Sequence, residues 1–579
     1  MGTNSTPGSC THPTAVTFLG VLLSLLLSTH RNAAAPRPPL PGDDGELAVA
    51  ATPLLSCLVA SGVRNFSLAG SLGYAALLSF SIQNLRFAGP GVRKPAAVVL
   101  PASLRGLRRA VLCARAASMG IRVRSGGHSY EGQSYTVVAG AAGEDEGVPF
   151  VVIDLMNLNK VRADAASATA WAESGATLGE LYYAVAHSPA PAPSNRSASS
   201  SRLAFTAGSC STVGVGGHIS GGGFGLLSRK FKLAADNVLD ALLVDAEGRV
   251  LDRRAMGEDV FWAICGGGGG SWGVVYAWKL RLVPVPDTVT AFRPTRTGSV
   301  DAIAGLVHRW QHVGPALPDE FYLSVFLTIG GASRENGSNN ATVSFTGLVL
   351  GTKELAMSVL GERFPELGLA GTEVSEMTWV ESAAHFAGLS SVEELRSRDS
   401  KTKYYGKNKS DYVRRPIPRH AVAAILRYLA AGPAGYAILD PYGGAMARAG
   451  STDTPFPHRA GNLYSVQYGV TWEAAGGEDD DGGEARSMAW LRALHAYMAP
   501  HVSNPRAAYV NYMDLDLGDE GLAANGSASA SAVSRARSTW GAAYFSAENF
   551  DRLVRAKTII DPANVFNNAQ SIPTSEMQG

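Results

Sequence analysis

Residues 207–225 read AGSCSTVGVGGHISGGGFG, and this glycine-rich stretch decides the fold. Two further stretches of the same kind, RSGGHSYEG at 124–132 and GGGGGSWG at 266–273, lie on either side of it. Glycine lets backbone N–H groups approach a ligand closely, and successive N–H groups form a nest that suits a pyrophosphate. The alternative is that the three stretches make tight turns only. We expect them to form a shared cofactor site.

The last of these stretches does not indicate a Rossmann fold. Residues 268–273 (GGGSWG) match the GxGxxG pattern, but any run of glycines produces such a match. The dinucleotide-binding fingerprint also requires a helix directly afterwards. Residues 274–285 (VVYAWKLRLVPV) instead alternate as a strand does, so the sequence excludes that fold here.

Length and composition indicate a globular protein of two domains. The chain has 579 residues, more than one ordinary hydrophobic core organises. Hydrophobic residues make up 46% of it and charged residues 17%. The formal net charge is +1 and the chain contains no basic stripe, so we expect no nucleic-acid partner.

Hydrophobic spacing predicts an α+β fold. The first half alternates short strands with helices, and the second half, from about residue 288, is expected to form an antiparallel sheet covered by helices. Residues 188–202 are expected to form an exposed insertion and 477–484 an acidic loop. The predicted helices are 46–60, 103–119 (ended by Gly120), 177–187 (capped by Thr177), 300–312, 353–360, 419–431 and 485–498. The predicted strands are 96–101, 121–124, 151–155, 321–328, 341–350, 435–440 and 463–472.

The N-terminal residues predict secretion. Residues 15–27 (AVTFLGVLLSLLL) form an apolar run followed by small residues, which is typical of a signal peptide spanning 1–35. The alternative is a membrane anchor, but a span needs ~20 apolar residues and this run is shorter. We therefore expect a secreted glycoprotein, outside the membrane, in the apoplast or cell wall. Acceptor sequons begin at Asn65, Asn195, Asn336, Asn340, Asn408 and Asn525.

Five cysteines are present, at positions 10, 57, 113, 210 and 265. Cleavage of the leader would remove Cys10, and an exported protein is expected to pair most of the others. Their pairing does not follow from the sequence pattern. Because no CxxC occurs, we expect no structural metal site.

The ordered motifs together resemble the plant berberine bridge enzyme-like family, within the FAD-linked oxidases of the vanillyl-alcohol-oxidase type, and its grass pollen members in particular. Besides the glycine-rich stretches, the matching text includes FWAICGGGGGSWGVV at 261–275, KSDYV at 409–413, TPFPHRAGNLY at 454–464, NYMDLDLG at 511–518 and DPANVFNNAQSIP at 561–573. The resemblance implies a two-part FAD-binding domain of the PCMH type over 45–287, with a core over about 93–287. It also implies a substrate-binding domain over 288–510 with an antiparallel sheet backed by helices. A C-terminal segment, 511–579, is expected to return to the FAD domain.

The resemblance implies FAD attached twice, through His128 to the flavin 8α-methyl and through Cys210 to ring carbon 6. It also pairs Cys57 with Cys113 and leaves Cys265 as a free thiol, at a position where the family usually has Arg. We favour a structural role for His218 within its glycine-rich stretch. The positions expected to bind the cofactor are Arg124, Ser125, Gly126, Gly127, His128, Ser129, Ser209, Cys210, Val213, Gly214, Gly216, Gly217, His218, Ser220, Gly223, Phe224, Gly273, Val274 and Val275.

For catalysis the resemblance points to Tyr130 as the first candidate base, Gln467 beside the substrate and Tyr512 as the second base, with Tyr509 as a further phenol. Three departures from the pattern of monolignol-oxidising relatives put a lysine-assisted tyrosine base, and a monolignol substrate, in doubt. The departures are Ser465 for a Lys, Phe224 for a second pocket Tyr and Met513 for an Arg.

The implied function is oxidation of a small-molecule alcohol or oligosaccharide hemiacetal by hydride transfer to flavin N5. Val213 stands at the family's oxygen-gating position, and its small side chain favours oxygen as acceptor, giving hydrogen peroxide. One alternative is a dehydrogenase with another acceptor. The other is a secreted wall protein with a structural flavin. We expect the protein to act as a monomer.

Overall fold

The computed structural model describes residues 51–137, 148–188, 202–328, 340–400, 403–473, 481–518 and 530–575. The expected signal peptide, the sequons at Asn195, Asn336 and Asn525, and nearly all of the insertion at 188–202 lie outside the described residues. No helix in the described ranges has the length and apolar character that crossing a bilayer demands.

A small four-stranded sheet forms the first layer of the molecule. Its order is β1-β2-β4-β3, with β4 parallel to both β2 and β3. Two helices, α3 (Thr52–Ala60) and α5 (Leu104–Ala116), pack over its apolar side. The strands are β1 (Phe66–Leu68), β2 (Ala97–Val99), β3 (Gly120–Arg124) and β4 (Phe150–Asp154), and helix α4 (Tyr74–Phe80) follows β1.

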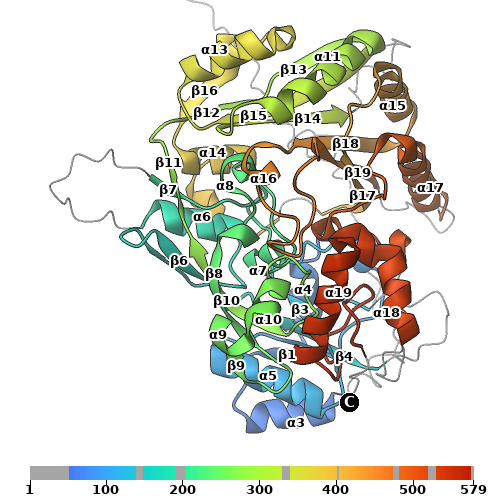
Figure 1. Cartoon of the computed structure of the whole chain (residues 1–579). Helices are drawn as coiled ribbons and strands as arrows, with labels where there is room; N and C mark the ends of the chain where they lie inside the picture. Colours follow the sequence, from blue (N-terminus) through green and yellow to red (C-terminus); the bar gives the residue numbers. More distant parts are fainter. Residues whose placement is uncertain are drawn as a thin grey trace, which may run out of the picture.

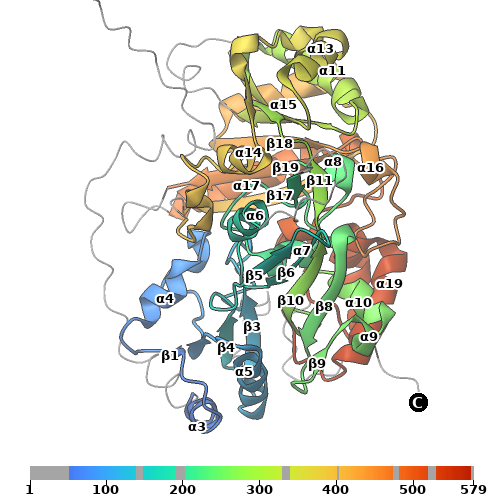
Figure 2. The same ribbon diagram turned by 90° about the vertical axis from the view of Figure 1, so that its left-hand side faces the viewer.

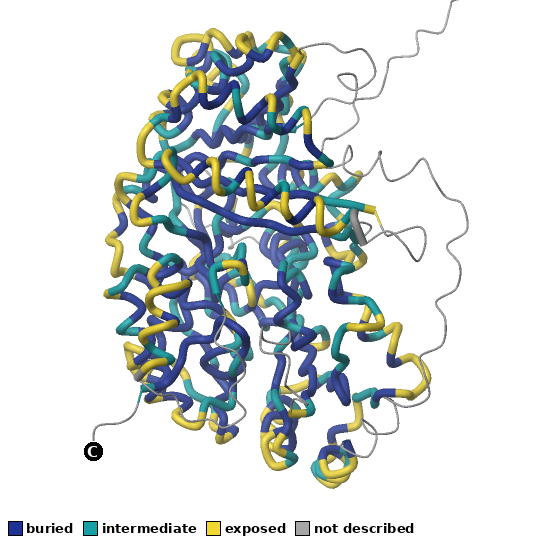
Figure 3. Tube along the Cα trace, turned by 90° about the vertical axis from the view of Figure 1, so that its right-hand side faces the viewer, coloured by how far each residue is buried: buried dark blue, intermediate teal, exposed yellow. Residues whose placement is uncertain are grey.

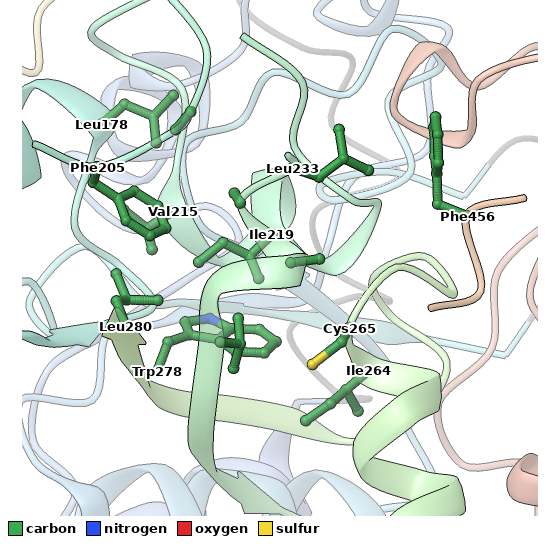
Figure 4. Packing of buried hydrophobic residues seen from close by; sticks show 14 of the residues in the cluster. Leu178, Phe205, Val215, Ile219, Leu233, Ile264, Cys265, Trp278, Leu280 and Phe456 are labelled. Atoms are coloured by element: carbon green, nitrogen blue, oxygen red, sulfur yellow. The ribbon is translucent and has the colours of Figure 1, made fainter. Parts of the chain in front are cut away.

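A second sheet, of order β5-β6-β10-β8-β9, is antiparallel throughout. Together with the first sheet it forms the part expected to bind the cofactor, residues 45–287, which we call the cofactor-binding part. The core beside it packs the side chains of Trp278 and Leu280 against those of Val215 and Ile219 (Figure 4). Its strands are β5 (Val161–Asp164), β6 (Thr169–Glu173), β8 (Val238–Val244), β9 (Val250–Leu251) and β10 (Val274–Arg281), while β7 (Arg202–Ala204) pairs with β11 (Val283–Val285). The helices here are α6 (Leu178–Ala186), α7 (Val215–Ser220), α8 (Ser228–Phe231), α9 (Arg253–Met256) and α10 (Glu258–Ile264).

The third sheet crosses the molecule between the cofactor-binding part and an outer layer of helices (Figure 1). Its order is β16-β12-β15-β14-β18-β19-β17, with β13 paired to β15. Its strands are β12 (Val289–Phe292), β13 (Thr295–Ser299), β14 (Phe321–Thr328), β15 (Asn340–Val349), β16 (Val374–Met377), β17 (Tyr405–Val413), β18 (Ala434–Pro441) and β19 (Tyr464–Trp472). The helices of this part are α11 (Val300–Val313), α13 (Lys353–Arg363), α14 (Trp379–Phe386), α15 (Arg419–Ala431), α16 (Gly444–Ala447) and α17 (Asp481–Tyr497).

The two faces of this sheet differ in chemistry. Alternate residues point to opposite sides of a strand. Apolar side chains such as Val325, Leu439 and Val466 form a core with α11 and α15. The opposite face carries polar side chains, among them Ser465 and Gln467 of β19. This polar face lies toward the cofactor-binding part.

The C-terminal helix returns to the cofactor-binding part. Helix α19 (Ala542–Ile560), preceded by α18 (Ala530–Ala536), runs beside α10, as both ribbon views show (Figures 1 and 2). Arg552 of α19 pairs with Asp259 of α10 at 2.7 Å. Buried residues run through both parts, whereas exposed ones follow the outer sides of the peripheral helices (Figure 3).

Most predicted elements have counterparts in the structure. Thr177 caps α6, accepting a hydrogen bond from the N–H of Glu180, whose carboxylate in turn accepts from the Thr177 N–H. A strand, β10, follows the last glycine-rich stretch, in agreement with the exclusion of a Rossmann fold. The fold is α+β, as predicted.

Some boundaries were wrong. Helix α5 ends at Ala116, and Gly120 begins β3, because Ser118 already reverses the chain with a φ of +54°. The acidic loop predicted at 477–484 is wrong from Asp481 onward, where helix α17 begins. Strand β17 was not predicted as a strand. Its central residues, KNKSD at 407–411, lack the expected apolar alternation because both of its faces bury polar side chains.

Candidate active site

A cavity of about 460 Å³ lies where the three glycine-rich stretches converge. The loop after β3, the turn leading into α7 and the loop before β10 form its walls. The C-terminal segment completes it with Val510, Asn511, Asn567 and Asn568. Its volume lies within the roughly 300–1,000 Å³ of small-molecule sites.

His128 and Cys210 meet at this cavity although 82 positions separate them in the chain. The hydroxyl Oγ1 of Thr212 lies 3.0 Å from His128 Nε2 and 3.8 Å from Cys210 Sγ. Burial lowers the pKa of His128 to about 4, so the imidazole is neutral at physiological pH. The Cys210 residue is exposed at the cavity, and its thiol lies beside the Thr212 hydroxyl. A neutral imidazole and a thiol on one wall are two potential nucleophiles.

The glycines of the walls separate into two kinds. A Cβ on Gly126 would lie 2.3 Å from the backbone nitrogen of Gly214, so these two loops interlock only without side chains. A Cβ on Gly217 would meet no protein atom within 4 Å, because this glycine faces the cavity. The protein itself does not require glycine at 217, but a ligand lying against the backbone would. The cradle therefore fits a large cofactor such as FAD.

Most residues expected to bind the cofactor do line the cavity. Four do not. Arg124 is fully buried in an ion pair with Asp154 at 2.7 Å, and Phe224 stacks on Tyr442 with ring centroids 5.1 Å apart. Ser209 and Gly223 also lie off the cavity wall. The residues that line it are Ser125, Gly126, Gly127, His128, Ser129, Cys210, Val213, Gly214, Gly216, Gly217, His218, Ser220, Gly273, Val274 and Val275.

Sequence reasoning missed part of the wall. Arg122, two residues before Arg124 on β3, lines the cavity, and so do Ser174, Tyr404 and Asn568. The sequence contains the motif that includes Asn568, but the residues of this motif do not indicate that it lies beside the glycine-rich stretches. His218 lies at the cavity and accepts a hydrogen bond from the N–H of Gly208 at 3.1 Å, which also anchors the Cys210 loop.

The candidate catalytic residues come from three separate segments. Gln467 of β19 donates a hydrogen bond from Nε2 to the Tyr130 hydroxyl at 2.8 Å. The rings of Tyr130 and Tyr512 lie 5.6 Å apart, and both residues line the cavity. Burial, together with neighbouring tyrosines such as Tyr404, holds the pKa of Tyr130 well above its usual value. Tyr130 is therefore a neutral phenol at physiological pH.

Tyr509, the further candidate phenol, has a different environment. Its hydroxyl oxygen accepts hydrogen bonds from the backbone N–H groups of Gly223 and Phe224 at 3.0 and 3.1 Å, and from Asn511 Nδ2 at 3.0 Å. These donors join the glycine-rich loop to the C-terminal segment. The Tyr509 hydroxyl therefore connects these two segments, which is a structural role.

Asp440 is the acidic group that the sequence analysis did not single out. It lies on β18 directly opposite Ser465, so its side chain shares the polar face with Gln467. It is 8% exposed, and the Tyr322 hydroxyl donates a hydrogen bond to its Oδ1. Burial raises the pKa of Asp440 to about 6.

Asp440 differs from the other buried carboxylates of the described ranges, because it alone has no Lys or Arg partner. Buried charges in proteins are normally paired, so an unpaired one indicates a functional site. A distinctive short motif around Asp440 would have been needed to find it from sequence. The other six buried carboxylates are all paired: Glu131 with Lys407, Asp154 with Arg124, Asp245 with Arg249, Asp411 with Arg506, Asp514 with Lys409, and Asp561 with Lys557.

One expectation on surface chemistry needs correction. Asn408 is 1% exposed, and its Oδ1 accepts a hydrogen bond from Tyr436 at 2.9 Å, so the prediction of a glycan at Asn408 is wrong. Asn65 and Asn340 are exposed. Cys265 is a free thiol, as expected, and it packs into the apolar core beside Ile264 and Trp278 (Figure 4). The Cys57–Cys113 disulfide is present.

Comparison with known proteins identifies the family. A model described as an FAD binding domain matches residues 95–253, and one described as berberine and berberine like matches 508–573. Berberine bridge enzyme-like D-2 of Nicotiana tabacum is 51% identical over 538 residues, covering 90% of each chain.

Two solved structures extend the likeness to the fold. Berberine bridge enzyme from Eschscholzia californica is 45% identical with a TM-score of 0.81, covering 90% of this chain and 99% of that one. Phl p 4, a grass pollen allergen with glucose dehydrogenase activity, is 37% identical with a TM-score of 0.80 and the same coverage. With the glycine-lined cavity, these matches show that the chain belongs to the berberine bridge enzyme-like family of FAD-linked oxidoreductases.

Proposed function

We propose that the protein is a secreted oxidase that holds FAD through both His128 and Cys210 and oxidises an alcohol or a carbohydrate hemiacetal. The observation that carries the oxidation step is Asp440, an unpaired buried carboxylate on the polar sheet face that also bears Gln467. Asp440 does not itself line the cavity, and Tyr512 lies at the cavity wall. Oxidation of a hydroxyl group needs a proton acceptor, and a carboxylate with a pKa of about 6 is suited to that task near neutral pH.

FAD bound in the cavity would supply the hydride acceptor. His128 and Cys210 hold it from one wall, and their shared contact with Thr212 sets the distance between the two attachment points. The glycine-rich loops offer backbone N–H groups to its pyrophosphate. A cofactor held covalently needs no lid over it, so the pocket can stay open toward a large substrate.

The chain's own residues handle the substrate hydroxyl. Tyr130, with its hydroxyl oriented by Gln467, donates a hydrogen bond that positions the substrate. Tyr512 lines the cavity, and burial together with the nearby Asp440 carboxylate holds the pKa of Tyr512 well above its usual value. As the substrate carbon loses its hydride, we propose that the substrate hydroxyl gives its proton to the Tyr512 oxygen. The Tyr512 proton is then taken up by Asp440, whose carboxylate acts electrostatically on Tyr512. Asp440 ends protonated and Tyr512 is unchanged.

We rank a sugar hemiacetal level with an aromatic alcohol as substrate. Ser465 carries no charge and therefore supplies no cationic partner for Tyr130 or Tyr512, which weakens the case for a tyrosinate base. A carboxylate surrounded by tyrosines suits a polyhydroxylated substrate, and one relative is described as having glucose dehydrogenase activity.

Oxygen is the proposed acceptor, with hydrogen peroxide as product. Val213 lies at the cavity beside Cys210, and its small side chain leaves room at the oxygen-gating position. A dehydrogenase using another acceptor, and a wall protein with a structural flavin, are the competing proposals. The leader and the exposed sequons at Asn65 and Asn340 favour a secreted glycoprotein.

The test starts from acid-precipitated protein and its flavopeptides. Yellow colour in the pellet, with mass spectrometry placing flavin on both His128 and Cys210, supports the attachment, whereas free flavin in the supernatant contradicts it. Anaerobic stopped-flow reduction with cellobiose and with coniferyl alcohol then ranks the two substrate classes. Peroxide release after admission of air separates an oxidase from a dehydrogenase, and no reduction by either donor class supports a structural flavin.

A further inference from the structure

Lys407 is a buried cation placed between two segments of the active site. Its side chain is 2% exposed and projects from the middle of β17. Its Nζ forms an ion pair with Glu131 and another with Asp514 at 2.7 Å. Burial alone would lower the pKa of Lys407, but Glu131 and Asp514 raise it, so the lysine stays charged.

Each partner of Lys407 is close in sequence to a residue of the active site. Glu131 directly follows Tyr130 and lies three residues after His128. Asp514 lies two residues after Tyr512. One ammonium group therefore joins the loop of the proposed flavin attachment and the turn of the proposed proton relay, which are more than 370 positions apart.

Lys409, two residues along the same face of β17, is a natural comparison. It is 3% exposed and pairs with Asp514 at 2.7 Å and Asp516 at 2.6 Å. None of its described ion pairs reaches Glu131 or the His128 loop. Lys407 also lies 3.7 Å from Asp516, so the two lysines share burial, strand and both aspartate partners. They differ in that Lys407 also pairs with Glu131.

A neutral side chain reinforces the link at the same point. Asn84, 1% exposed, donates hydrogen bonds from Nδ2 to the carbonyl oxygens of Tyr130 and Gly406, both at 2.9 Å. Gly406 immediately precedes Lys407. The backbone of the Tyr130 loop is therefore fixed to β17 at Gly406, and its next side chain to β17 at Lys407.

We infer that Lys407 is a positioning residue, which holds the His128–Tyr130 loop at the cavity and in register with the segment of Tyr512. The inference rests on the proposed attachment of flavin at His128. Attachment requires a ring nitrogen of His128 to lie within near-attack distance of the flavin, and a misplacement of about 1 Å can slow such a step on the order of 100-fold. Cys210 lies on a loop that Lys407 does not touch, so its attachment is expected to be independent of Lys407.

The experiment compares Lys407→Met with Lys409→Met, each purified with the flavin acquired during expression. Flavopeptide mass spectrometry measures the share of flavin on His128 and on Cys210. Lys407→Met is expected to carry flavin mainly at Cys210 alone, whereas Lys409→Met keeps both attachments. Equal shares in the two variants would overturn the inference, because a general loss of stability affects both. If Lys407→Met does not accumulate, Glu131→Gln replaces it with the same expected asymmetry.

A second readout does not depend on covalent flavin. Hydrogen–deuterium exchange over 126–135 is expected to speed up in Lys407→Met and to match the wild type in Lys409→Met. If wild-type protein carries no covalent flavin, the proposed function fails, while this exchange result still decides the role of Lys407. Unchanged exchange in Lys407→Met would refute the positioning role.

Discussion

At the scale of single residues, Asp440 combines two properties that conflict in an ordinary core. It is buried, and no cation of the described chain compensates its charge. The groups that face it are phenols, those of Tyr322, Tyr442 and Tyr512. Arg459, which acts on Tyr442, is already paired with Asp236. An ionised Asp440 therefore destabilises the fold, which is typical of a residue retained for chemistry.

Asp440→Asn is expected to raise stability and lower activity. The folded-state pKa is raised from 3.8 to about 6, so the folded protein binds the proton more tightly and loses stability as pH rises through this window. A shift of that size corresponds to about 3 kcal/mol, and the variant is expected to gain up to that amount at pH 7 and nothing near pH 3. The measurement is denaturant unfolding at several pH values.

The same variant is expected to reduce the rate of flavin reduction by about 10²–10⁴-fold. In the wild type this rate is expected to fall as pH drops below about 6, and the variant is expected to lose that dependence. Asp287→Asn, at an exposed site, provides the control. A variant that keeps the wild-type rate and pH profile would show that Asp440 does not take the proton.

At the scale of elements, the disulfide joins the two helices that cover the first sheet. Cys57 of α3 and Cys113 of α5 are 56 positions apart and lie against the apolar side of that sheet. Because α3 is short, its position depends on the covalent link and on few buried side chains, Leu54 and Leu58 among them.

Replacing both cysteines by serine is expected to destabilise the protein by about 4 kcal/mol, since a closed loop of this length restricts the unfolded chain. Urea unfolding of the double variant measures the change. Cys265→Ser, which breaks no disulfide, separates loss of the link from loss of a buried sulfur. An unchanged urea midpoint in the double variant would contradict the expectation.

At the scale of the whole molecule, the C-terminal segment closes the cofactor site that the first half begins. Lys557 of α19, fully buried, donates hydrogen bonds of 2.7 Å to the carbonyl oxygens of Ser271 and Phe566 and to Asp561. One side chain thus fastens the last glycine-rich loop to the segment that carries Asn567 and Asn568 at the cavity.

Lys557→Met is expected to destabilise the protein by about 3–5 kcal/mol, because it leaves the Asp561 carboxylate buried and unpaired. Limited proteolysis is expected to cut the C-terminal segment sooner than in the wild type. Arg555→Met, on an exposed position of the same helix, is the matched control. Equal proteolysis of the two variants would mean that Lys557 does not hold the segment.

Local chemistry allowed much of the fold to be predicted. The capping of α6 by Thr177, the strand after residue 273 and the apolar spacing of α11 and α15 depend on neighbouring residues in the chain, which is why they are readable in it. Strand β17 was not predicted, because its residues 407–411 (KNKSD) are polar on both faces of the strand. Its lysines become acceptable inside the protein only through Glu131, Asp514 and Asp516 from elsewhere.

Residues 207–225, with the two other glycine-rich stretches, determined the prediction of a cofactor site. The likeness of the ordered motifs to the family selected His128 and Cys210. Only the tertiary structure brought these two side chains to one Thr212 hydroxyl, buried Asn408 and left Asp440 without a cation. The reason is the range of the interactions. Glycine conformation, capping and periodicity act over a few residues, whereas the pairing and desolvation of charges depend on strands far apart in the sequence.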